Sequence, residues 1–143
     1  MKVLTRDFGE VEVTENDVVK FEQKIFGFED YSDYIILYDD DFNGEYAWLQ
    51  SVKEPGLCFI IANSELTVSN YEPECEKEAE KIIGMGKYEY WFVMVVKDNI
   101  KESTINLKSP VVINTDNHKA MQIILEKNYP VKYYLFNNGK EQQ

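Results

Sequence analysis

The chain contains few of the residue types that carry out catalysis. His118 is its single histidine, and Cys58 and Cys75 are its two cysteines. A Ser-His-Asp triad would need His118 beside an exposed nucleophile, and Ser109 lies outside any nucleophile-elbow pattern. One histidine and two cysteines cannot fill a zinc cage alone. We therefore interpret His118 as a surface or loop residue, and the cysteines as free thiols of a reducing compartment.

The segment 39–44, with sequence DDDFNG, matches the first half of a calcium-loop pattern. Asp39, Asp41 and Asn43 occupy alternate positions and Gly44 occupies the turn. The pattern then needs a bidentate Glu where this chain has Gln50, and the flanking segments alternate like strands. Asn-Gly between two such segments is the strongest short signal for a β-hairpin. A calcium-binding acidic β-module stays an alternative, and it predicts a calcium-dependent rise in melting temperature that Asp39→Ala removes.

Acidic residues dominate the charge of the chain. Asp and Glu number 26 against 15 Lys and Arg, which gives a formal net charge of −11. Such a chain repels nucleic-acid phosphates and anionic membranes, and it favours a basic protein partner. A carboxylate-pair hydrolase is the second alternative, because a catalytic pair could lie among so many acids. The charge runs fall in predicted turns or on a helix exterior, so we expect no catalysis, no metal site and no cofactor.

The densest acidic run, residues 72–80, is the predicted docking surface. A hairpin at residues 39–45 would support it, and the neighbouring tyrosine would serve as an aromatic anchor. The residues predicted to contact a partner are Asn70, Tyr71, Glu72, Glu74, Glu76, Glu80, Asp41 and Glu45.

Strands are the main elements expected to position these residues. Alternating and β-branched segments predict strands at residues 3–5, 11–13, 18–21, 34–38, 46–52, 57–62, 88–97, 104–107, 111–113, 121–125 and 133–136. Short strands at this spacing indicate a mostly β fold, an antiparallel barrel or sandwich. We predict a small antiparallel β-barrel-like domain with one short amphipathic helix.

The predicted helix covers residues 73–83. Pro73 suits its first position and Gly84 its end. A second short helix or turn is expected near residues 116–120.

We predict one domain over residues 1–136, followed by a polar, flexible tail at residues 137–143. Residues 1–20 contain no apolar signal core, and the longest apolar runs are far shorter than the roughly 20 residues of a spanning helix, so we expect a cytoplasmic protein that does not enter membranes.

Four stretches together resemble the FliW family of flagellar assembly factors. Two departures, Lys24 at a position where glycine is usual and Phe26 in place of a common proline, would alter a turn without altering the fold. The stretches are residues 21–29 (FEQKIFGFE), residues 48–52 (WLQSV) continued by 55–61 (PGLCFII), residues 69–72 (SNYE), and residues 104–114 (TINLKSPVVIN) followed by 122–125 (QIIL).

The resemblance implies a small β-barrel-like fold and a regulatory, non-enzymatic role. Members of the family bind CsrA, a dimeric RNA-binding translational repressor, and they also bind flagellin, which suggests a chaperone-like role. Binding to CsrA relieves repression of flagellin mRNA, and flagellin competes for the factor. We expect an acidic face of this chain to dock beside the RNA-binding surface of CsrA. Its carboxylates would then oppose RNA phosphates without necessarily occupying the RNA site.

Overall fold

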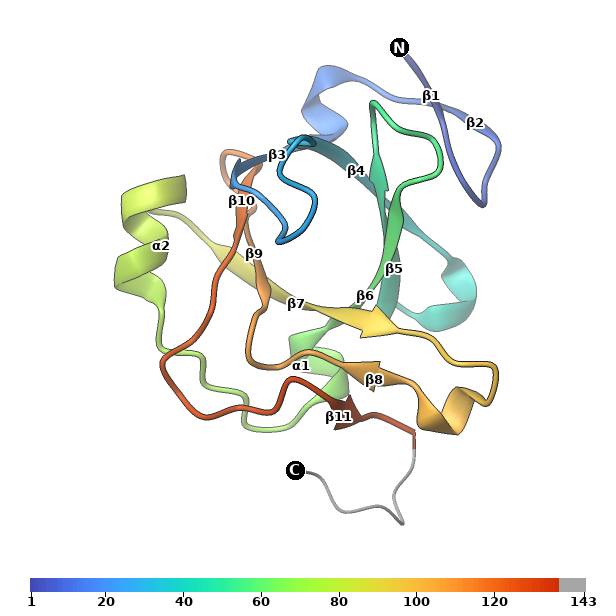
Figure 1. The fold of residues 1–143 in the computed structure, drawn as a ribbon. Coiled ribbons are helices and arrows are strands. Elements are labelled where there is room, and N and C mark those ends of the chain that lie inside the picture. Colours follow the sequence, from blue (N-terminus) through green and yellow to red (C-terminus); the bar gives the residue numbers. More distant parts are fainter. Residues whose placement is uncertain (137–143) are drawn as a thin grey trace.

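A computed structural model describes residues 1–136 of the chain as a mostly β structure (Figure 1). The predicted tail at residues 137–143 lies outside the described residues. Short 3-10 helices occupy Glu15–Asp17, Asp40–Phe42 and Ile100–Glu102. The α-helices are α1 (Ser64–Thr67) and α2 (Glu76–Ile83), and the strands are β1 (Lys2–Leu4), β2 (Glu10–Glu12), β3 (Val18–Gln23), β4 (Asp33–Tyr38), β5 (Tyr46–Ser51), β6 (Cys58–Asn63), β7 (Tyr88–Val95), β8 (Thr104–Ile105), β9 (Val111–Asn114), β10 (Lys119–Gln122) and β11 (Tyr133–Tyr134).

Seven strands close into a barrel. The order is β7-β6-β5-β4-β3-β10-β9, and β9 pairs back onto β7. Every pairing in this ring is antiparallel except that of β3 with β10, where Lys20 lies beside Lys119. The predicted mostly β, barrel-like fold is therefore confirmed, with one parallel pairing that joins distant parts of the chain.

The barrel interior is filled by alternate residues of its strands. Ala47 and Leu49 of β5 are fully buried, while Tyr46 and Trp48, which alternate with them, face outward and are half-buried. The interior cluster includes Phe21, Tyr34, Leu49, Ile61, Trp91 and Val111. This alternation follows from the period of two in a strand, which sends successive side chains to opposite faces of the sheet.

Three smaller layers cover the outside of the barrel. The β1–β2 hairpin packs Val3 and Val13 against β3 and β4. Helix α2 packs against β9 and β10, as Figure 1 shows at the left of the molecule. The segment around α1, β8 and β11 packs over Ala62 and Phe92. No helix within residues 1–136 is long and apolar enough to cross a bilayer.

The structure corrects several predicted boundaries. Helix α2 begins at Glu76 instead of Pro73, because Glu74 adopts a left-handed backbone with φ 51° that a helix cannot contain. Its predicted end at Gly84, with φ 80°, is confirmed. The predicted strand at residues 121–125 starts earlier, at Lys119, and ends at Gln122. Helix α1, a single turn, was not predicted.

Candidate functional site: a groove beside an acidic helix

Helix α2 is amphipathic, and its apolar stripe fixes it to the barrel. Cys75, Ala79 and Ile83 lie four residues apart on one face and are at most 3% exposed. They pack against Val112 and Met121 of β9 and β10. Residues four apart on a helix share a face, so the remaining face, which is rich in glutamate, points into solvent.

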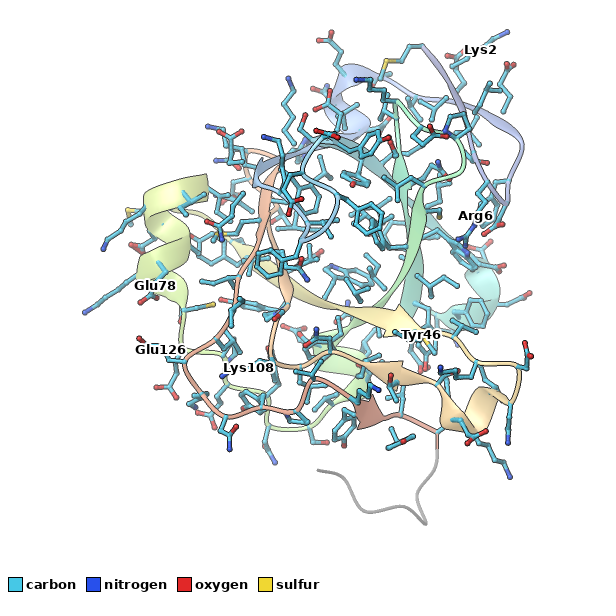
Figure 2. All side chains as sticks on the ribbon, in the orientation of Figure 1. Lys2, Arg6, Tyr46, Glu78, Lys108 and Glu126 are labelled. Carbon is cyan, nitrogen blue, oxygen red and sulfur yellow. The ribbon has the colours of Figure 1, made fainter. Side chains whose placement is uncertain are left out.

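A groove of about 450 Å³ runs between α2 and the chain that follows β10. Its apolar part includes Ile82 and Ile124, which are 36% and 61% exposed. Its rim carries the carboxylates of Glu74, Glu78 and Glu126. Figure 2 shows Glu78 and Glu126 on this same side of the molecule. The site therefore combines exposed apolar surface with negative charge, which suits an apolar and basic partner surface.

The start of the acidic run is tied to the barrel by its tyrosine. The Tyr71 hydroxyl donates to the Leu107 carbonyl at 2.8 Å. The Tyr71 ring lies edge-on to Phe92 and beside Tyr129, with centroids 4.7 and 4.8 Å away. The Tyr129 hydroxyl in turn accepts from the Glu72 N–H at 3.0 Å. These contacts fasten the segment to the barrel, so the Tyr71 ring does not project as a free anchor, and its burial raises the pKa of the hydroxyl.

One predicted contact residue already has a partner in this chain. Glu74 forms an ion pair with Lys127, across one end of the groove. The hydrogen bond to this carboxylate raises the pKa of Lys127. Within residues 1–136, no ion pair involves Glu72, Glu76 or Glu80, which are exposed.

The eight predicted contact residues fall on two separate surfaces. Asn70, Tyr71, Glu72 and Glu74 precede α2, and Glu76 and Glu80 lie on it. Asp41 and Glu45 lie in the β4–β5 connection, which Figure 1 shows at the right of the barrel, across from α2. The hairpin and the helix therefore lie on different sides of the barrel.

Sequence reasoning missed the second wall of the groove. Ile124 and Glu126 belong to the segment that follows β10, far from α2 in the sequence. This segment reaches α2 because β10 pairs in parallel with β3. A signal was present in the run Ile123–Leu125, where alternation exposes the middle residue: Ile123 is 9% exposed, Ile124 61% and Leu125 3%.

The residues considered for chemistry have ordinary structural positions. His118 is exposed in the turn between β9 and β10, as predicted. Burial raises the pKa of Cys58, and it raises that of Cys75 to about 11, so both thiols stay protonated near neutral pH. Within residues 1–136, no three His, Cys, Asp or Glu side chains gather into a potential metal site.

The calcium-loop interpretation lacks its last ligand in the structure. Asp39 caps the 3-10 turn by accepting from the Asp41 N–H at 2.9 Å. Gln50, at the position that the pattern reserves for glutamate, is buried in β5 and donates to the carbonyls of the 51–57 turn. The loop joins two strands, with Asn43 and Gly44 at φ 51° and 82°, as the hairpin interpretation requires.

Comparisons with known proteins agree with the fold. A family model described as FliW protein matches residues 2–135. The flagellar assembly factor FliW of Alkaliphilus metalliredigens is 34% identical over 147 residues, which cover 100% of this chain and 91% of that protein. The FliW of Lachnospira eligens is 33% identical over 150 residues, covering 100% of this chain and 99% of that protein.

A solved structure gives the same result in three dimensions. A crystal structure of the flagellar assembly factor FliW superimposes with a TM-score of 0.87 at 28% identity, and the match covers 98% of this chain and 100% of that one. Family model, relatives and fold coincide over nearly the whole length. The chain therefore belongs to the FliW family of flagellar assembly factors.

Proposed function

We propose that this flagellar assembly factor acts in the cytoplasm by binding other proteins and not by catalysis. Its first partner is CsrA, whose repression of flagellin mRNA it relieves. Flagellin is the competing partner, so the amount of free flagellin sets the amount of factor available to CsrA. The family resemblance supports both partners, and the net charge of −11 supports a basic one.

The observation that carries the proposal is the groove beside α2. Ile82 and Ile124 offer apolar surface for a partner to cover, and the carboxylates of Glu74, Glu78 and Glu126 rim it. Exposed apolar surface contributes affinity, while the charged rim orients the partner and speeds its approach. The exposed acids of α2 would then lie beside the RNA-binding surface of CsrA, where they repel RNA phosphates.

The test measures CsrA binding to wild type and to the double variant Glu72→Lys with Glu76→Lys. We expect the variant to bind at least about tenfold more weakly at low salt, because two repulsive charges replace two attractive ones. The matched control is Glu15→Lys with Glu102→Lys, which makes the same charge change at two exposed residues away from α2. We expect this control to bind within about twofold of wild type.

Adding flagellin to the complex of this chain with CsrA tests the competition. Flagellin added to the purified complex should release CsrA, and labelled flagellin mRNA should then bind CsrA again. Unchanged binding by the variant Glu72→Lys with Glu76→Lys would contradict the placement of the contact. A wild-type chain that binds neither protein would contradict the proposed function itself.

A further inference from the structure

Five aromatic rings form a continuous line on the side of the barrel away from α2. The ring of Phe8 lies edge-on to Trp48 at a centroid distance of 5.0 Å. Phe42 contacts Trp48 and Tyr46 at 5.8 and 5.6 Å, and Tyr46 contacts Phe136 at 6.1 Å. We call these five residues the aromatic strip.

The strip is built from parts of the chain that are far apart. Tyr46 and Trp48 are the outward-facing residues of β5. Phe8 comes from the tip of the β1–β2 hairpin, Phe42 from the 3-10 turn before β5, and Phe136 from the segment after β11. The assembly is therefore a product of the fold that no local sequence pattern could show.

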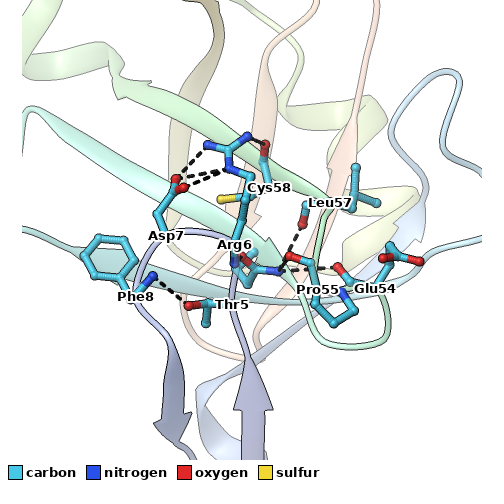
Figure 3. Close-up of polar contacts among 9 residues, drawn as sticks. Thr5, Arg6, Asp7, Phe8, Glu54, Pro55, Leu57 and Cys58 are labelled. Atoms are coloured by element: carbon cyan, nitrogen blue, oxygen red, sulfur yellow. Dashed lines mark hydrogen bonds and ion pairs between the residues drawn. The ribbon is translucent and has the colours of Figure 1, made fainter.

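Local hydrogen bonds hold the turns that carry Phe8 and Phe42. The Phe8 N–H donates to Thr5 at 2.8 Å, and the Arg6 guanidinium bridges Asp7 and the Cys58 carbonyl, which fixes the hairpin tip to β6 (Figure 3). Phe42 follows a turn capped by the Asp39 carboxylate. A surface held in this way loses little conformational entropy when a partner binds.

Three rings of the strip are exposed, and acidic residues lie close to them in the sequence. Phe8 and Phe42 are each 39% exposed and Phe136 is 37% exposed. Asp40 and Asp41 precede Phe42 in the same 3-10 turn, and Glu45 directly precedes Tyr46. Among residues 1–136, no Lys or Arg forms an ion pair with these three carboxylates.

The strip lies apart from the groove beside α2. Figure 2 places Tyr46 and Arg6 toward the right of the barrel, whereas Glu78 and Glu126 lie at its left edge. No strip residue lines the α2 groove. A partner segment could therefore occupy the strip without contacting α2.

We propose that the aromatic strip is a second docking surface, which takes a protein segment carrying arginine or lysine interleaved with apolar side chains. Aromatic faces attract cations, and the three carboxylates add charge complementarity. The exposed ring surface provides apolar area for the segment to cover, in the aromatic-rich composition common at the centres of interfaces. An acidic segment or a nucleic acid would be repelled by the same carboxylates.

The experiment uses the full chain and a dye-labelled synthetic peptide of alternating arginine and leucine. Binding is followed by fluorescence anisotropy of the peptide and by the emission of Trp48. Trp91 is 1% exposed and serves as an unresponsive internal reference. Peptides in which serine replaces leucine, or glutamate replaces arginine, separate the contribution of the rings from that of the charges.

Two triple variants remove the same number of charges at different places. The strip variant combines Asp40→Asn, Asp41→Asn and Glu45→Gln. The control combines Glu15→Gln, Glu22→Gln and Asp30→Asn, three exposed residues outside both the groove and the strip. We expect the strip variant to lose about tenfold in affinity and the control to stay within about twofold of wild type. Phe42→Ser, checked for folding by its melting temperature, should weaken binding by a further severalfold.

Three results would overturn the proposal. They are equal losses in the two triple variants, equal binding of the arginine–serine peptide, and absence of binding by the arginine–leucine peptide. The first would reduce the interaction to general attraction between opposite charges. This assay contains neither CsrA nor flagellin. A negative result would therefore not bear on the proposed function, which the CsrA-binding experiment tests separately.

Discussion

Gln50 allows a sharp test of how a buried amide holds the barrel together. The residue is 0% exposed, and its Oε1 accepts from the Arg6 N–H at 2.9 Å. Figure 3 shows the surrounding turn. Its Nε2 lies 3.0–3.4 Å from four backbone carbonyl oxygens, those of Ser51, Glu54, Pro55 and Leu57.

The variant Gln50→Glu would point carboxyl oxygens at those carbonyls. The side chain can stay buried only by taking up a proton, so its pKa in the folded state rises above the value of about 4.3 in the unfolded chain. Below that value the variant loses little to ionisation, and its stability falls as pH rises toward the folded-state pKa. Each pH unit in that interval costs about 1.4 kcal/mol, which amounts to about 1.6 kcal/mol at about pH 5.5 and about 3.7 kcal/mol at about pH 7.

The assay is urea unfolding at both pH values, followed by tryptophan fluorescence. Both conditions lie above the isoelectric point of about 4.5. Gln50→Leu is the matched control, because it loses the same hydrogen bonds and cannot titrate. Its difference in unfolding free energy from wild type should be equal at the two pH values. A pH-independent difference for Gln50→Glu would refute the claim that this side chain is buried against carbonyl oxygens.

Three further predictions concern single residues. Tyr34→Phe should raise the free energy of unfolding by up to about 1 kcal/mol in a urea titration, because the buried Tyr34 hydroxyl has no hydrogen-bond partner among the described residues. The Cys75 thiol, with a pKa of about 11, should be alkylated by iodoacetamide far more slowly at neutral pH than in urea, with a rate that climbs as pH approaches 11. Gly86→Ala should lower the melting temperature and cost about 1–3 kcal/mol, because a Cβ there would lie 2.3 Å from the Asn114 side chain; an unchanged melting temperature would contradict the close approach.

Local pattern predicted the strands well and their closure poorly. Alternation and the Asn43–Gly44 turn located the β4–β5 hairpin, because a hairpin is encoded by adjacent residues. The parallel pairing of Lys20 with Lys119 joins strands that no short pattern connects. The start of α2 was misplaced because Pro73 is compatible with a first helical turn, while the left-handed backbone at Glu74 is set by its surroundings.

The residues that carry the family resemblance are mainly structural, which explains why they did not locate a binding surface. Gln50, in the WLQSV stretch, holds the turn after β5. Asn114, which ends the TINLKSPVVIN stretch, donates to the carbonyls at the end of α2. Gln122 joins the Ser109 carbonyl to the Phe26 N–H. These buried amides specify the barrel. Ile124 of the groove and Trp48 of the aromatic strip lie in the same stretches, but the residues that complete each surface come from elsewhere in the chain.

The separation of the two surfaces constrains the competition proposed above between CsrA and flagellin. Coupling between remote sites requires an element with two discrete arrangements, and the strands between groove and strip form a closed, hydrogen-bonded ring. We therefore expect competition to arise from a shared contact at the α2 groove. Flagellin should displace CsrA equally well from wild type and from the variant Asp40→Asn, Asp41→Asn, Glu45→Gln. If this triple variant still binds CsrA but flagellin no longer displaces it, flagellin binds at the aromatic strip. That result would contradict a shared contact at the α2 groove.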